Sequence, residues 1–288
     1  MAYSTPTDSK TASIHRMLIQ GGPNSGKTHA VCSTWPEPLA IVVCPGEQGD
    51  ATIPRGNPNI TPFIWSEDPI EKLSSANVVI AVDTLVAEIL GGKHGTFKSL
   101  CIDGYHKYYA YVLDWQSGGS LFKGESLGNP DDPYSSARIY NRAREYARYR
   151  VQRVNAAPME NVVWTCWDGR EADDPTKGFK SKTHVFPGLP GQAAKEFMGE
   201  FGLVVHSRIN WGIRVLPDPA RVPKGMKPTD VNRFEAKWQL IPEGDVWGAS
   251  VKAPIEVIER LPLYCAQSYP VLKKLLEDAW ASTRPGGP

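Results

Sequence analysis

Short apolar runs alternate with amphipathic stretches through the first two thirds of the chain. Continuous apolar runs bounded by turn residues predict buried strands at 14–20, 39–44, 100–102 and 161–167. A run at 60–65 is flanked by prolines, so we expect it at the edge of a sheet. Helices are predicted between these runs at 26–33, 83–90, 105–115 and 135–154. The alternation predicts an α/β fold with a mostly parallel central sheet flanked by helices.

The last third of the chain has a less regular pattern. It predicts a helix ending near Met198, strands at 203–206, 211–216 and 234–241, and a final helix at 270–281. Long polar stretches at 117–133 and 168–185 are expected to be loops, and loops of this length are commonly functional. We therefore expect a flexible tail at 1–12, a core at 13–260, and a C-terminal helix with a disordered tail at 261–288.

The segment from Gly21 to Thr28 matches the pattern GxxxxGK[ST] at every fixed position, and it lies between a predicted strand and a predicted helix. Glycines allow backbone N–H groups to curl around phosphates, and the helix N-terminus favours negative charge. The pattern predicts a nucleoside triphosphate site, with ATP as the expected nucleotide and Mg²⁺ as the metal. The expected nucleotide-binding residues are Gly22, Pro23, Asn24, Ser25, Gly26, Lys27, Thr28 and His29.

Such a site also needs an acidic residue at the end of a strand, which holds Mg²⁺ together with the Thr28 hydroxyl. Asp103 ends the predicted strand at 100–102. Asp83 competes, because it follows the apolar residues 78–82, and its alternative interpretation is a helix N-cap. The order of helices and strands favours Asp103.

Hydrolysis requires a group that orients the attacking water. Many motor ATPases carry glutamate directly after the metal-binding aspartate, but this chain has Gly104 there. Glu47 lies just past the second predicted strand, at the sheet edge where open α/β sheets bind ligands. We therefore predict Glu47 and Lys27 as the catalytic residues, and we assign no role to His106.

Composition narrows the choice of compartment and partner. The net charge of +1 excludes a general polycation, and no apolar run reaches the roughly 18–20 residues of a membrane span. The five cysteines show no CxxC or CxxH spacing, which argues against zinc sites and disulfide scaffolds and favours a reducing cytoplasm.

The phosphate-binding loop, the glutamate beyond the next strand and the separate strand ending in aspartate resemble the RecA-like P-loop ATPase core. With the segment 187–191, residues 14–260 are similar to phage ATPases of the Sak-type single-strand annealing group. The resemblance implies a DNA-stimulated ATPase that binds single-stranded DNA and assists annealing or strand exchange in phage recombination. It also implies a homo-oligomer, ring or filament, in the host cytoplasm, with a single-strand-binding protein as a further partner.

The chain departs from this family in two places. Thr165, Cys166 and Trp167 stand where RecA has a glutamine sensor, and the metal-binding strand ends in Asp-Gly rather than Asp-Ser. Two other classes also carry a P-loop: DNA-translocating motors (packaging or helicase) and small-molecule kinases. The arginines that a kinase lid would need lie instead on a predicted amphipathic helix ahead of a core strand.

The resemblance assigns DNA contacts to two loops, of which the first, near 117–134, carries too little positive charge. The second combines cations with aromatic residues, as sequence-tolerant single-strand binding requires. Its expected DNA-binding residues are Arg170, Lys177, Lys180 and Lys182. Lys252 lies where RecA relatives place a lysine that reaches the ATP of the adjacent subunit. The six arginines between 138 and 153 are interpreted as a solvated helix face, with a nucleic-acid stripe or an arginine finger as alternatives.

Overall fold

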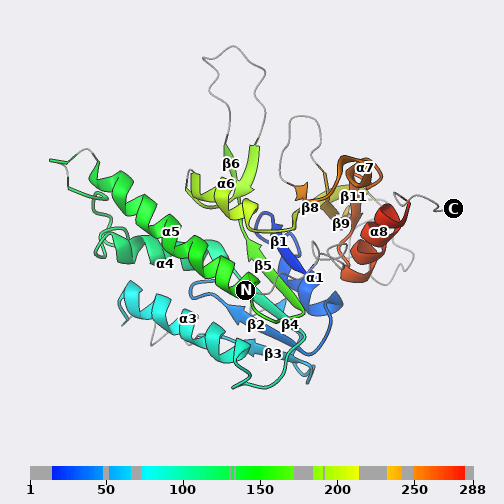
Figure 1. Cartoon of the computed structure of the whole chain (residues 1–288), viewed down its shortest axis with the longest axis horizontal. Helices are drawn as coiled ribbons and strands as arrows, with labels where there is room; N and C mark the ends of the chain where they lie inside the picture. The colour runs from blue at the N-terminus through cyan, green and yellow to red at the C-terminus, as the bar shows by residue number, and fades with distance from the viewer. Residues whose placement is uncertain are drawn as a thin grey trace, which may run out of the picture.

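A computed structural model describes residues 15–47, 52–65, 73–129, 131–132, 134–171, 184–190, 192–213, 232–241 and 249–282. Within these residues, a nine-stranded sheet forms the centre of the molecule (Figure 1). Across the sheet, its strands are β11 (Tyr264–Ala266), β9 (Asn232–Gln239), β8 (Leu203–Ile213), β1 (Arg16–Gln20), β5 (Asn161–Cys166), β4 (Ser99–Asp103), β2 (Leu39–Val43) and β3 (Ile60–Phe63), with β10 (Ser250–Val251) paired to β8.

The strands from β8 to β3 are all parallel, whereas β9, β10 and β11 pair antiparallel with their neighbours. The helices are α1 (Lys27–Thr34), α3 (Ser75–Leu90), α4 (Tyr105–Gln116), α5 (Ser135–Asn155), α6 (Gln192–Gly199), α7 (Ile255–Ile258) and α8 (Tyr269–Ala281). The predicted α/β fold, with a mostly parallel central sheet flanked by helices, is confirmed, and β3 lies at the predicted edge.

Apolar residues cover both faces of the sheet, which explains why its strands read as continuous apolar runs. Cys101 and Ile102 are neighbours on β4, yet they belong to different hydrophobic clusters because successive side chains point to opposite faces. One cluster joins the sheet to α3, α4, α5 and α6, and the other joins it to α1, α7 and α8 (Figure 1). Within the described part of the chain, no helix combines the length and apolar character that crossing a membrane requires.

Helix α3 is longer than the sequence pattern predicts, since it begins at Ser75 rather than at residue 83. Its buried positions include Val78, Val82 and Val86, which follow helical spacing, so the apolar run before Asp83 is a helix face and not a strand. Asp83 lies in the middle of this helix. Both interpretations of Asp83, as a helix N-cap and as a metal ligand, are therefore wrong.

Two further predictions are corrected in the part of the chain after β5. The strands expected at 203–206 and 211–216 are one strand, β8, because β9 pairs with it over the whole stretch from His206 to Ile213. The ends of the loop expected at 168–185 form an antiparallel hairpin of β6 (Asp168–Glu171) and β7 (His184–Pro187). Beyond residue 260, the chain adds a strand, β11, to the expected helix.

Candidate functional site

A cavity of about 530 Å³ opens at the carboxyl ends of β2, β4 and β5, beside the loop that joins β1 to α1. Open α/β sheets commonly bind ligands at this edge. The residues that line it are Pro23, Asn24, Ser25, Gly26, Lys27, Thr28, His29, Glu47, Thr52, Asp103, Thr165 and Trp167. Residues predicted from separate parts of the sequence are thus brought together around one cavity.

The loop before α1 is held against strand β8. A Cβ atom at Gly21 would lie 2.6 Å from the carbonyl oxygen of Ser207, so only glycine fits there. The Ser207 hydroxyl donates to the Ser25 carbonyl at 2.7 Å, and the Gln267 amide donates to the same carbonyl at 3.0 Å. Gly26 precedes the helix with φ at +84°, a conformation that glycine adopts readily. Packing from β8 and the segment after β11 therefore fixes the shape of the phosphate-binding loop.

Lys27 is nearly buried at the start of α1, with 8% of its surface exposed. Its ammonium donates to the carbonyl oxygens of Gly21 and Gly22, both at 2.8 Å. Burial lowers the pKa of Lys27, while the nearby carboxylates of Asp103 and Glu47 oppose this shift. The position provides a buried cation at the cavity wall, surrounded by acidic groups that favour its charged form.

Thr28 and Asp103 form the second part of the site. The Thr28 hydroxyl donates to both carboxylate oxygens of Asp103, at 3.1 and 3.0 Å. Thr165 donates to the same carboxylate and accepts a hydrogen bond from the backbone N–H of Gly104 at 2.9 Å. Burial raises the pKa of Asp103, whereas the hydrogen bonds from Thr165 and Thr28 lower it.

This donor set fits Mg²⁺ bound together with a triphosphate. A hydroxyl and one carboxylate are hard oxygen ligands, and Mg²⁺ is usually held by one or two carboxylates with substrate phosphates. Among the described residues, no group of three or more His, Cys, Asp or Glu side chains is placed to hold a metal alone. Thr28 and Asp103 would therefore hold the metal jointly with phosphate oxygens and water.

Glu47 reaches the cavity from the loop after β2, and its side chain is 13% exposed. The space that it occupies exists because residue 104 is glycine. A Cβ atom at Gly104 would lie 2.7 Å from Cγ of Glu47 and 2.8 Å from its Oε2. The Asp-Gly pair, which departs from the family pattern, is thus explained by the glutamate that packs against it.

His106 contacts Glu47, although the sequence analysis assigned it no role. Its Nε2 lies 3.3 Å from Oε2 of Glu47, while its Nδ1 accepts from the backbone N–H of Trp167 at 3.3 Å. Burial, together with the charges of Lys107 and Lys27, lowers the pKa of His106 to about 3. A neutral imidazole that accepts at Nδ1 carries its proton on Nε2, facing the carboxylate. In the sequence, His106 could have been recognised because it follows Asp103 by three residues, in the first turn of α4.

Asp168 and His206 form a second acidic–imidazole pair beside the phosphate-binding loop. His206 Nε2 lies 3.1 Å from Oδ2 of Asp168. A Cβ atom at Gly22 would lie 3.6 Å from Oδ1 of Asp168. Because Asp168 begins β6, the pair connects the β6–β7 hairpin to β8 next to this loop. Neither residue was predicted from the sequence pattern.

The residues predicted to bind DNA are only partly within the described chain. Arg170 lies in β6, where its backbone is opposite Val185. Lys177, Lys180 and Lys182 lie outside the described residues. Lys252 follows β10, and its ammonium donates to the carbonyl oxygen of Gly199.

Several arginines of α5 pair with carboxylates from neighbouring segments. Arg148 lies 2.8 Å from Glu200, and Arg150 lies 2.8 Å from Asp83. Arg138 pairs with Asp132, and Arg144 with Glu196 at 3.4 Å. These ion pairs support the interpretation of the arginines as a polar helix face rather than a stripe for nucleic acid.

No family model matches the chain, and no curated protein sequence matches it. Among solved structures, similar chains include the assembled ATPase EscN of the type III secretion system of enteropathogenic E. coli, at 12% identity and a TM-score of 0.39. EscN in complex with its central stalk EscO is similar at 13% identity and a TM-score of 0.36. In each case the match covers 67% of this chain but less than half of the other, 43% and 42%. Since both TM-scores lie below 0.5, the fold assignment rests on the strand order of this chain itself.

Proposed function

We propose that this protein is a Mg²⁺-dependent P-loop ATPase with a RecA-like core, which binds single-stranded DNA and assists annealing or strand exchange as a homo-oligomer. The observation that carries the proposal is the position of Glu47. Its carboxylate lines the same cavity as Lys27 and Asp103, and Gly104 and His106 hold it there. A nucleotide-binding protein without hydrolysis has no need of a carboxylate fixed at this place.

The loop residues would bind the triphosphate through backbone N–H groups, with Lys27 turning from the carbonyls of Gly21 and Gly22 toward the β- and γ-phosphates. Mg²⁺ bound beside Thr28 and Asp103 would neutralise charge that develops on these phosphates. Glu47 would orient a water molecule for attack on the γ-phosphate. Its contact with His106 holds the carboxylate in place for that task.

The DNA part of the proposal is supported by the path of the chain after β5. Thr165 on β5 contacts Asp103, and three residues later Asp168 begins the β6–β7 hairpin beside Gly22. The same short segment therefore joins the proposed metal site to the loop that carries Lys177, Lys180 and Lys182. Cations and aromatic residues in that loop suit phosphate contacts and base stacking.

The sharpest test is Glu47→Gln, which preserves shape but removes the negative charge. We expect ATP turnover to fall by about 10²-fold or more, the scale of losing a positioned general base. ATP affinity should stay within a few-fold, because Lys27, Thr28 and the backbone carry binding. Calorimetry and steady-state hydrolysis with saturating single-stranded DNA measure both quantities.

Lys27→Ala is the matched control, since it should abolish ATP binding itself. Hydrolysis by Glu47→Gln at the wild-type rate would refute the assignment of the base. Wild-type hydrolysis that single-stranded DNA leaves unchanged would refute the DNA part of the proposal, and phosphoryl transfer to a nucleoside monophosphate would identify a kinase instead.

A further inference from the structure

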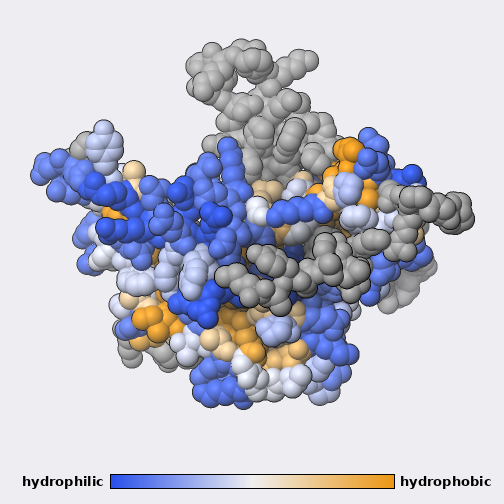
Figure 2. Space-filling model, viewed as in Figure 1, coloured by the Kyte–Doolittle hydropathy of each residue, from blue (hydrophilic) through white to orange (hydrophobic). Residues whose placement is uncertain are grey.

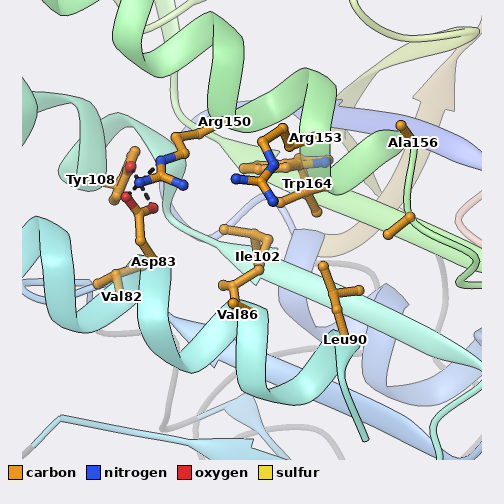
Figure 3. A pocket seen from close by; sticks show the side chains of 13 residues that line it. Val82, Asp83, Val86, Leu90, Ile102, Tyr108, Arg150, Arg153, Ala156 and Trp164 are labelled. Atoms are coloured by element: carbon orange, nitrogen blue, oxygen red, sulfur yellow. Dashed lines mark hydrogen bonds and ion pairs between the residues drawn. The ribbon is translucent and has the colours of Figure 1, made fainter.

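A second cavity, of about 340 Å³, lies between α3 and α5 over strands β4 and β5 (Figure 3). Its wall is mostly apolar and includes Val86, Leu90, Ile102 and Trp164. Ile102 and Trp164 belong to the hydrophobic cluster on the α3–α5 face of the sheet, whereas α1 packs on the other face. The cavity is therefore separate from the nucleotide site.

The polar side chains in this wall have partners within the protein, with one exception. Asp83 accepts from the Tyr108 hydroxyl at 2.8 Å and pairs with Arg150 at 2.8 Å. The indole N–H of Trp164 donates to Asn155 at 3.0 Å. These contacts leave the interior without an available donor or acceptor apart from one arginine.

That arginine is Arg153, at the mouth of the cavity. In Figure 3 its guanidinium lies beside Trp164, and no dashed line reaches it. Within the described part of the chain no carboxylate pairs with it, and its charge lies 5.8 Å from the ring of Tyr149. Figure 2 shows the same division, with a hydrophilic surface over α5 and a hydrophobic one between α5 and α3.

We propose that this cavity binds a small anionic amphiphile, an alkyl carboxylate of medium chain length. The volume lies at the lower end of small-molecule sites, which span about 300–1,000 Å³. An apolar chain gains free energy by leaving water for such a wall. The carboxylate would pair with the guanidinium of Arg153 at the rim, where arginine offers two parallel N–H donors. A cationic amphiphile would instead meet the guanidinium of Arg153, since the charge of Arg150 is balanced by Asp83.

The test is calorimetric titration of the full chain with hexanoate, heptanoate and octanoate below their micelle concentrations. We expect affinity to rise by about fourfold for each added methylene group. Octanoate should bind at least about tenfold more tightly than octanol, which lacks the charge, and octylammonium should bind more weakly still. No increase along the series, or equal binding of octanoate and octylammonium, would overturn the proposal.

Two variants locate the site. Arg153→Gln, at an exposed position, should reduce octanoate affinity to that of octanol, whereas Arg142→Gln on the same helix, away from the cavity, should leave it unchanged. Ala87→Phe, at an exposed position of the wall, should fill the mouth and abolish binding. ATP affinity, unchanged in all variants, reports that each one is folded. Equal loss in the variants at 142 and 153, or undiminished binding after Ala87→Phe, would place octanoate elsewhere and refute the assignment.

Discussion

At the scale of single residues, the position of the Glu47 side chain depends on Gly104, which has no side chain of its own. Gly104 has φ at +82° and touches the glutamate, so alanine there would be unfavourable for two reasons. The left-handed backbone would cost about 1–2 kcal/mol, and the Cβ atom would push Glu47 out of place. A substitution at residue 104 would therefore change both the local backbone conformation and the position of Glu47.

We predict that Gly104→Ala lowers both the free energy of unfolding and the rate of ATP hydrolysis, the latter by about 10²-fold, as expected for a displaced catalytic group. Gly92→Ala is the matched control, because Gly92 has φ at +79° but no atom within 4 Å of the point where a Cβ atom would lie. Denaturant unfolding should show a similar backbone cost in both variants. An unaltered ATPase rate in Gly104→Ala would show that the contact with Glu47 has no catalytic value.

In the proposed mechanism His106 is a positioning residue, since it would act through Glu47. We predict that His106→Asn, which can keep the contact with the N–H of Trp167 but not the one with Glu47, lowers kcat by about tenfold, because Glu47 loses a side chain that holds its carboxylate in place. His106→Gln extends an amide toward Glu47 and should recover part of the loss. Single-turnover hydrolysis of both variants measures the effect.

The pH dependence separates this role from proton transfer. Because the folded pKa of His106 is about 3, the residue stays neutral above pH 5, and the two variants should leave the shape of the kcat profile between pH 5 and 8 unchanged. Folding also requires a neutral imidazole, so its contribution to stability is complete above its ordinary pKa of 6.5 and is lost as pH falls from there toward 3. A titration in the kcat profile that disappears in His106→Asn would contradict the positioning role.

At the scale of elements, strand β5 connects the proposed metal site to the β6–β7 hairpin. Thr165 contacts Asp103 within the sheet, and the chain then continues into the β6–β7 hairpin, whose first residue pairs with His206. A shift at the metal site can therefore pass along a few residues into the hairpin. This direct path supports the proposal that the loop between β6 and β7 contacts DNA.

We predict that changing Lys177, Lys180 and Lys182 together to Gln weakens single-stranded DNA binding and makes its salt dependence shallower. Each lost phosphate contact should reduce the slope of log affinity against log salt by about 0.7, and three contacts by about 2. Fluorescence anisotropy over a salt series measures this slope. Arg138, Arg142 and Arg148 changed to Gln on α5 form the control, and a larger effect there would move the DNA site to that helix.

At the scale of the whole molecule, the sheet separates two layers of helices. Helices α1 and α8 share one face, and α3, α4 and α5 share the other, which also holds the second cavity. The loops that carry the nucleotide site leave from the carboxyl edge. Lys252 lies at the opposite, amino edge of the sheet, where its backbone N–H donates to the carbonyl of Gly202 beside the start of β8. Its ammonium donates to the carbonyl of Gly199, and it is not among the residues lining the nucleotide cavity of its own subunit.

We predict that Lys252 acts on the nucleotide of an adjacent subunit in the assembled oligomer. Lys252→Ala should lose DNA-stimulated hydrolysis, and mixing it with Lys27→Ala, which is inactive but supplies Lys252, should restore activity. The measurement is ATPase rate against the ratio of the two variants, with Lys98→Ala as a surface control. Activity that never exceeds the sum of the separate variants would rule out action between subunits.

The sequence by itself determined those features that depend on residues close together along the chain. The P-loop is a continuous segment, so its pattern identified Lys27 and Thr28, and buried parallel strands are continuous apolar runs, so β1, β2, β4 and β5 were predictable. The prediction for α3 failed at its start, because a short apolar run is compatible with both a strand and a buried helix face.

Only the tertiary structure decided which distant residues meet. Glu47 and His106 are far apart in sequence, and their contact depends on how β2 and β4 pair and on the missing side chain at Gly104. Strand β8 reaches its full length only because β9 pairs with it. The second cavity exists only because α3 and α5 are held apart over the sheet. Local propensity carries no information about such contacts, because their energies arise only when the sheet has brought the chain segments together.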